Sequence, residues 1–247
     1  MRHFSSLLLF LALLALLEWG LPRLGMPDYI LPRPSQVLAA ARDPQTRLLR
    51  HSLLTTVESL GGLLLGAAGG YLLAVVFVLA PPIEAALYPW VVVSQTIPLV
   101  ALAPLLIFWF GNGIAPRIAL AALFAIFPVI VSTVRGLRDY SREDRELLQI
   151  YDASPWQVFR LLRLPSSLPA LFSGLKIAAT LSVIGAITGE LAGASEGLGF
   201  AISVAARRLE TARSFAAVAA AAGLGLSMHL ALGLAERRIV FWRVLSG

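Results

Sequence analysis

The side chains that could do chemistry are few in this chain and widely spaced. It has no cysteine, which excludes disulfides, thiolate catalysis and cysteine-ligated metal sites. His51 and His229 each stand alone in the sequence, and we expect neither to bind a metal or act in catalysis. Its uncharged stretches hold no paired carboxylates and no His–acid pair, so the sequence predicts neither an enzyme active site nor a cofactor.

The single lysine also argues against a nucleotide site. A P-loop ends in Gly-Lys followed by Ser or Thr, because the backbone and the lysine together hold the phosphates. Lys176 instead lies between Leu175 and Ile177. We therefore expect any ATP-derived energy to come from another subunit.

The composition places the chain in a membrane. Of its 247 residues, 58% are hydrophobic and 14% are charged, and the mean hydropathy is +0.80. Soluble domains carry about 25% charged residues, and a single core of this length could not hide so much apolar surface. The net charge of +6 then concerns topology and lipid headgroups rather than nucleic acid.

Long uncharged stretches mark where the chain should cross the bilayer. A helix of about 20 apolar residues spans the hydrocarbon core and satisfies its own backbone there. Six stretches are candidates: residues 4–17, 59–83, 85–116, 118–134, 164–189 and 214–235, of which 164–189 contains one charge, Lys176. The apolar runs are continuous, without the alternation of barrel strands. We therefore predict an all-α polytopic membrane protein with about six transmembrane helices.

Three segments follow from this division. Residues 1–21 should form an N-terminal transmembrane helix; a cleaved signal peptide is the alternative, but no small-x-small site follows Glu18. Residues 22–50 should form a loop rich in proline and arginine, and residues 51–247 the core. Glycines repeat every four residues at Gly62-Gly66-Gly70 and Gly185-Gly189-Gly193, a pattern that predicts close packing of helices within the chain.

The loop 135–165 reads as two short helices joined by a sharp turn. Ser141 can cap the first helix, and the chain should break at Asp152. Ser154 and Gln157 form a capping box around a favoured proline and should open the second helix.

Two alternatives remain open for this hairpin. Trp156 and Phe159 near its tip suit a knob that binds another protein, but an amphipathic hairpin lying on lipid headgroups would look the same. Pro165 and Pro169 should stop the second helix before the next span.

The loop resembles the "EAA" coupling motif of binding-protein-dependent ABC importer permeases, which runs roughly E-A-A-x-x-x-G-A-S-x-W-x-x-F-x-x-x-x-L-P. The residues that carry the resemblance, and that it implies contact an ATPase, are Glu146, Asp152, Ala153, Ser154, Trp156, Phe159 and Pro165. Leu147-Leu148 replace the two alanines, and Asp152 replaces a glycine that permits a left-handed turn. Aspartate adopts that turn at a cost of roughly 1 kcal/mol, so coupling could be weaker than in the family, and a non-transporting scaffold stays an alternative.

The resemblance covers nearly the whole chain from about residue 30 and is closest to the nitrate/sulfonate/taurine-type permeases. The other segments that carry it are Pro34-Ser35-Gln36-Val37, Gln95-Thr96-Ile97-Pro98, Ala101-Leu102-Ala103-Pro104-Leu105, Trp109-Phe110-Gly111, Phe127-Pro128, Ser173-Gly174-Leu175-Lys176 and Gly193-Ala194-Ser195 with Gly197-Leu198-Gly199. Ser94-Gln95-Thr96-Ile97-Pro98 and the segment from Ser173 to Thr180 are most similar to permeases for pyrimidine precursors of thiamine.

Such a resemblance implies the type I ABC importer permease fold and a set of partners. These are a cytoplasmic ABC ATPase dimer, a periplasmic or lipid-anchored substrate-binding protein, a second copy of this chain and membrane lipid. It implies a bacterial inner-membrane protein whose termini and coupling loop face the cytoplasm. Without the resemblance, the positive-inside rule barely favours this orientation, because ten arginines lie on the side of the termini and nine on the opposite side. An ion-gradient-driven secondary transporter is the functional alternative, although no buried acid cluster or internal repeat supports it.

Polar residues within the spans are candidates for the substrate path. They are Ser94, Gln95, Thr96, Thr180, Ser182 and Glu190. Gln95 is the most suggestive because Pro98 leaves a backbone carbonyl free nearby, whereas Glu190 lies near a span end. We expect Glu58 at a helix start. Arg207, Arg208 and Arg213 could pair with acids on the binding protein, and a plain solvated face is the alternative.

Overall fold

The computed structural model describes residues 2–20, 23, 25 and 27–242, with the side chains of residues 2–7 and 10 excepted. Within these ranges the chain is helical and contains no strand. The predicted all-α class is therefore confirmed. The end of the predicted first helix, residue 21, lies outside the described residues.

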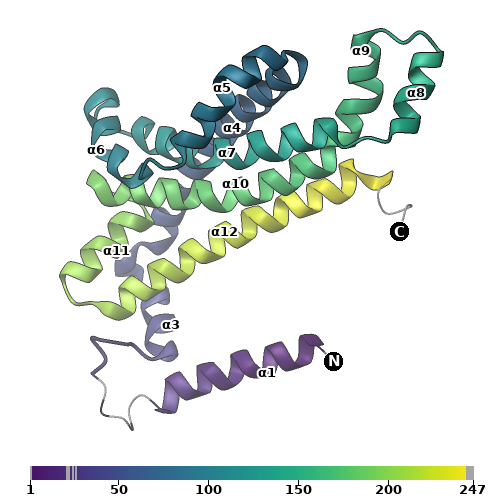
Figure 1. Cartoon of the computed structure of the whole chain (residues 1–247). Helices are drawn as coiled ribbons and strands as arrows, with labels where there is room; N and C mark the ends of the chain where they lie inside the picture. The colour runs from purple at the N-terminus through teal and green to yellow at the C-terminus, as the bar shows by residue number, and fades with distance from the viewer. Residues whose placement is uncertain (1, 21–22, 24, 26, 243–247) are drawn as a thin grey trace.

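Four helices are long and apolar enough to cross a membrane. They are α4 (Leu48–Leu79), α7 (Ala115–Arg138), α10 (Leu164–Gly193) and α12 (Thr211–Ile239). Helix α7 packs against both α4 and α10, and α12 runs along α10 (Figure 1). Apolar side chains from these helices, such as Val129, Val183 and Met228, form a core cluster at their centre.

The two glycine stripes pack closely against neighbouring helices, as predicted; α7 is the neighbour of every member except Gly193, whose nearest neighbour is the side chain of Ile107. A β-carbon added at Gly66 would lie 2.7 Å from the carbonyl oxygen of Ala122, and one at Gly70 would lie 2.8 Å from that of Ile126. On the other side of α7, a β-carbon at Gly185 would lie 2.7 Å from Cα of Ala121. Small residues let three backbones meet here, which is how helices gain packing energy in lipid.

The longest uncharged run is not one straight span, contrary to the prediction for residues 85–116. It forms α5 (Pro81–Ser94) and α6 (Leu99–Phe110), which meet at an angle of 100°. Pro98 caps α6 in extended conformation and lacks the N–H that would continue α5. Ser94 and Thr96 donate their hydroxyl hydrogens to carbonyl groups within α5, at 2.7 Å each. The turn therefore satisfies part of its backbone locally, and the run becomes a bent pair.

The region expected to be a loop contains a helix. α1 (Arg2–Ala15) continues into the π-turn η1 (Leu16–Gly20), and α3 (Pro34–Arg42) with the short η2 (Pro44–Thr46) leads into α4. Glu18 accepts hydrogen bonds from the Ser35 N–H at 3.0 Å and the Ser35 hydroxyl at 2.6 Å, which ties η1 to α3. Figure 1 shows α1 standing apart from the central bundle, while α3 packs on α12.

Candidate functional site

The predicted hairpin protrudes from one end of the bundle as α8 (Arg142–Ile150) and α9 (Pro155–Val158) (Figure 1). Ser141 Oγ accepts the Asp144 N–H at 3.0 Å and so caps α8. Ser154 Oγ accepts the Gln157 N–H at 3.3 Å, and the Ser154 N–H donates to Gln157 Oε1 at 2.7 Å. Both predicted caps are therefore confirmed, including the reciprocal capping box.

The turn between the two helices is left-handed at Asp152, where φ is 50°. The Asp152 N–H donates to the Gln149 carbonyl at 3.0 Å, and the Ala153 N–H donates to the Leu148 carbonyl at 3.0 Å. The last carbonyls of α8 thus gain partners in the turn. The family pattern has glycine at this left-handed position, and in this chain Asp152 adopts the same conformation.

Replacing Asp152 with glycine should therefore be tolerated, because glycine reaches positive φ without the penalty of roughly 1 kcal/mol that a side chain carries. We expect ATPase binding and uptake at or above the wild-type level. The matched variant Asp152→Val, with a branched β-carbon at the same φ, should weaken both. Complete loss of uptake in Asp152→Gly would show that the carboxylate has its own role.

The hairpin exposes a large apolar surface. Trp156 is 64% exposed and stacks on the buried Phe159, with ring centroids 5.7 Å apart. Ile150 and Tyr151 are 77% and 75% exposed on the facing helix. Glu146 forms an ion pair with Arg142 at 2.8 Å on the outer face of α8. Aromatic groups held rigidly on a protruding element are typical of a protein-binding surface.

The second helix of the hairpin does not stop at Pro165 or Pro169, contrary to the prediction. α9, the π-turn η3 (Phe159–Arg163) and α10 form one 39-residue helix, Pro155–Gly193. Leu164 and Pro165 come directly after the π-helical segment η3, where the shifted hydrogen-bond register accommodates the missing N–H of Pro165. The hairpin is consequently joined to a membrane span without a flexible link.

The predicted path residues fall into two groups. Ser94, Gln95 and Thr96 lie exposed at the bend between α5 and α6. Thr180 is exposed on α10 and, together with α12, lines a cavity of about 570 Å³. Ser182 and Glu190 are instead buried inside the bundle. Of the six, only the first three come together.

Glu190 belongs to a buried polar network that sequence reasoning missed. Its Oε1 lies 2.5 Å from Thr55 Oγ1 of α4, and its Oε2 accepts the Gly199 N–H at 2.5 Å. The Leu198 N–H donates to Thr55 Oγ1 at 2.9 Å, and the Gly197 N–H donates to His51 Nδ1 at 3.0 Å. Three successive N–H groups before and within α11 (Leu198–Arg207) are thus held by side chains of α4 and α10.

The network continues to Glu58 and Arg117. Glu58 Oε1 lies 3.0 Å from Arg117 Nη1 of α7, with the Glu58 side chain 1% exposed. Because α4 begins at Leu48, Glu58 lies in the third turn, so the expectation of a helix start is wrong. His51, Thr55 and Glu58 are spaced i, i+4 and i+7, a spacing that places them on one helix face and could have indicated the network.

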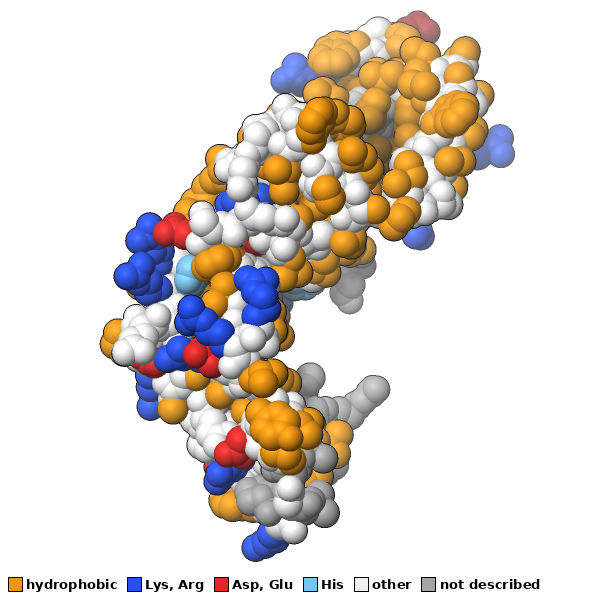
Figure 2. Space-filling view, turned by 90° about the vertical axis from the view of Figure 1, so that its left-hand side faces the viewer, with side chains coloured by type: hydrophobic (Ala, Val, Ile, Leu, Met, Phe, Trp, Pro, Cys, Tyr) orange, Lys and Arg blue, Asp and Glu red, His pale blue; other side chains and the backbone are white. Residues whose placement is uncertain are grey.

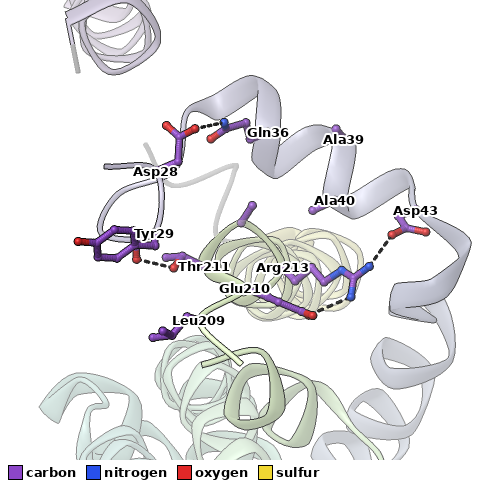
Figure 3. Close-up of a pocket in the computed structure, with 11 residues that line it drawn as sticks. Asp28, Tyr29, Gln36, Ala39, Ala40, Asp43, Leu209, Glu210, Thr211 and Arg213 are labelled. Atoms are coloured by element: carbon purple, nitrogen blue, oxygen red, sulfur yellow. Dashed lines mark hydrogen bonds and ion pairs between the residues drawn. The ribbon is translucent and has the colours of Figure 1, made fainter. Parts of the chain in front are cut away.

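A polar pocket of about 640 Å³ lies at the opposite end of the molecule from the hairpin, between α3 and the start of α12 (Figure 3). Arg213 binds Asp43 and Glu210, each at 2.9 Å. The prediction that Arg213 pairs with another protein is therefore wrong for this structure, since its guanidinium is engaged within the chain. The Gln45 N–H and the Arg213 guanidinium hold the pKa of the Asp43 carboxyl below its ordinary value.

Exposed arginines surround this pocket. Arg207 and Arg208 are exposed at the end of α11 and form no ion pair within the described part of the chain. Arg47 and Arg50 are exposed beside them at the start of α4, and Arg50 pairs with Glu196 at 2.5 Å. Figure 2 looks onto this end and shows Lys and Arg side chains gathered there with several acids. A face with many charged side chains therefore lies at the end opposite the hairpin.

The structure thus combines a bundle of apolar helices long enough to cross a membrane with a protruding hairpin at one end and charged side chains at the other. The model of the binding-protein-dependent transport system inner membrane component family matches residues 62–241. The chain belongs to this family, in the nitrate/sulfonate/taurine group of ABC importer permeases. Permeases of this family work with an ATPase and a substrate-binding protein.

Three relatives resemble the chain over most of its length. A probable ABC transporter permease protein of Haemophilus influenzae is 36% identical, with 89% of each chain covered. The formylaminopyrimidine transport permease protein ThiX of Halalkalibacterium halodurans is 35% identical over 96% of this chain and 94% of its own. The riboflavin transport system permease protein RibX of Chloroflexus aurantiacus is 35% identical over 93% and 87%.

Proposed function

We propose that this chain is the non-catalytic transmembrane subunit of an ATP-driven importer and that its hairpin transmits the ATPase movement to the bundle. The observation that carries the proposal is the single helix from Pro155 to Gly193, which begins at the hairpin and ends beside the charged face. A displacement at α9 must move α10, because no flexible segment separates them. Packed helices that move as rigid bodies would then open the path to alternate sides.

The ATPase contact should involve the family-motif residues of the hairpin. They are Glu146, Asp152, Ala153, Ser154, Trp156, Phe159 and Pro165. Of the aromatic pair, Trp156 contacts the partner directly, and the buried Phe159 supports it from below. Arg207 and Arg208, which lack acidic partners in the described chain, are the arginines available to acids on the binding protein.

A second copy of the chain should complete the path. The bent pair exposes apolar surface, including Trp90 at 70%, Phe108 at 84% and Trp109 at 66%. Ser94, Gln95 and Thr96 lie at the bend of the same pair, so pairing of two copies there would place three polar side chains per protomer at the seam. The other lipid-facing surface would contact membrane lipid in a bacterial inner membrane, with both termini cytoplasmic.

The substrate should be a small organic solute. The ThiX and RibX relatives carry names that refer to a pyrimidine and to riboflavin, and both are 35% identical to this chain. A pyrimidine precursor of thiamine is therefore our first choice, with sulfonate, taurine or nitrate-like anions next. Because the external binding protein selects the ligand first, the ligand that co-purifies with that protein is the direct test.

Energy coupling is tested by uptake in vesicles that contain this chain, its ATPase and its binding protein. Uptake should require ATP inside the vesicle and survive collapse of the proton gradient. Uptake that continues without ATP and follows the gradient would indicate a secondary transporter.

The orientation in the membrane can be tested with single cysteines, because the chain has none of its own. Gln149→Cys should react with a membrane-impermeant thiol reagent only from the cytoplasmic side, and Arg208→Cys only from outside.

Replacing Gln95 with leucine should lower uptake several-fold without weakening ATPase binding. The amide lies exposed at the bend, where it can reach a solute but not the distant hairpin. Val93→Leu enlarges an exposed apolar side chain two residues earlier without removing an amide, and its uptake should stay near wild type. Equal uptake in Gln95→Leu and wild type would remove Gln95 from the path.

A further inference from the structure

Glu58 and Glu190 are two acids that are completely buried inside the bundle. Among the described residues, Arg117 is the cation that pairs with one of them. Each of the two glutamates is about 1% exposed, and Thr55, to which Glu190 is hydrogen-bonded, lies about one helical turn from Glu58 on α4. Arg117 pairs with Glu58, whereas Glu190 forms no ion pair within the described part of the chain. Glu58 Oε2 is also buried without a hydrogen-bond partner among the described residues. A second negative charge beside it would have no compensation.

The surrounding residues do not provide the missing positive charge. His51 Nδ1 accepts the Gly197 N–H, so this nitrogen carries no proton and the imidazole is neutral. Arg50 pairs with Glu196 at the surface, with its side chain 60% exposed. An uncompensated carboxylate buried among helices costs several kcal/mol. One proton on the two carboxyl groups would balance the charge of this cluster.

The hydrogen bonds of Thr55 are compatible with that proton on Glu190. Thr55 Oγ1 has three neighbours: the His51 carbonyl at 3.1 Å, the Leu198 N–H at 2.9 Å and Glu190 Oε1 at 2.5 Å. A hydroxyl has one hydrogen and two acceptor positions. Within a helix the hydrogen can go to the carbonyl four residues earlier, here that of His51. The Leu198 N–H fills one acceptor position, and the other faces Glu190.

We propose that Glu190 is a neutral carboxylic acid whose Oε1–H donates to Thr55, while Glu58 is the carboxylate that pairs with Arg117. All three contacts of Thr55 then join a donor to an acceptor, and Glu190 Oε2 still accepts the Gly199 N–H. The cluster carries no net charge. One bound proton thus fastens the turn before α11 to α4 and keeps α4, α7 and α10 together on the charged side of the bundle.

Infrared spectroscopy of the full chain in lipid at neutral pH tests the assignment. The wild type should show the C=O band of a protonated carboxylic acid, which is separate from the carboxylate bands and shifts in D₂O. Glu190→Gln should remove this band. Thr55→Val should move it to higher frequency, because the acid loses its acceptor.

Glu84→Gln is the matched control, since Glu84 is an acid paired with Arg138 near the surface, and the band should stay. A wild type without the band overturns the proposal whether or not any variant folds. A band that survives in folded Glu190→Gln also overturns it, because the proton then belongs to another residue.

Discussion

The variant Trp156→Ala is expected to lose transport while the protein still folds and inserts into the membrane. The indole is 64% exposed, so its removal takes little from the bundle. In a protein interface, however, a rigid tryptophan is a frequent hot spot whose truncation costs at least about 2 kcal/mol, or roughly 30-fold in affinity. We therefore expect the ATPase to be lost on co-purification, and uptake into vesicles to fall with it.

Two controls separate partner binding from local folding. Trp19→Ala removes the same side chain from η1, where it is 65% exposed and outside both the hairpin and the bent pair, and ATPase binding should not change. Glu146→Ala should weaken ATPase binding, whereas Arg142→Ala should not. Both variants break the same surface ion pair, which contributes only about 0.5 kcal/mol to the helix. Unchanged co-purification of the ATPase with Trp156→Ala would contradict the role of the hairpin.

The hairpin could be predicted because its determinants are local. Ser141 and Ser154 cap helices through residues three positions away, and Asp152 ends α8 by its own backbone conformation. Such short-range signals are present in the sequence whatever surrounds them. The glycine stripes were predictable for a related reason, since helical spacing alone places Gly62, Gly66 and Gly70 on one face.

The predictions for the segments around Pro98 and Pro165 were wrong because local sequence rules for proline do not include tertiary packing. Pro98 and Pro165 both lack an N–H, yet the chain turns by 100° near the first and continues as a helix through the second. At Pro165 a preceding π-turn changes the hydrogen-bond register, and neighbouring helices hold the result. In lipid a helix is favoured wherever it can form, so tertiary packing decides between a bend and a continuation.

The buried network escaped prediction because its partners are far apart in sequence. Thr55 and Glu190 are 135 residues apart, and His51 and Gly197 are 146 apart. Only the packing of α4 against α10 brings them together. Glu190 was identified as unusual because a buried ionisable group in a span is costly, but its position inside the protomer makes it part of the packing of the helices. The path proposal therefore depends mainly on the residues of the bend.

A β-carbon at Gly66 should separate α4 from α7, so the variant Gly66→Ala is expected to destabilise the bundle. The added atom would lie 2.7 Å from the Ala122 carbonyl oxygen, a backbone atom that cannot rotate away. Overpacking of this kind costs about 1–3 kcal/mol, which exceeds the gain of up to about 1 kcal/mol from alanine in a helix. Gly66→Leu should prevent recovery of folded protein.

Gly223→Ala provides the matched comparison, because no atom lies within 4 Å of its added β-carbon. The helix preference then acts alone, and stability should stay equal or rise slightly. Thermal unfolding in detergent, followed by tryptophan fluorescence, measures both variants on the same scale. If Gly66→Ala melts at or above the wild-type temperature, the α4–α7 contact is looser than described. A lower melting temperature for Gly66→Ala alone would show that the backbone contact, rather than glycine content, holds these spans together.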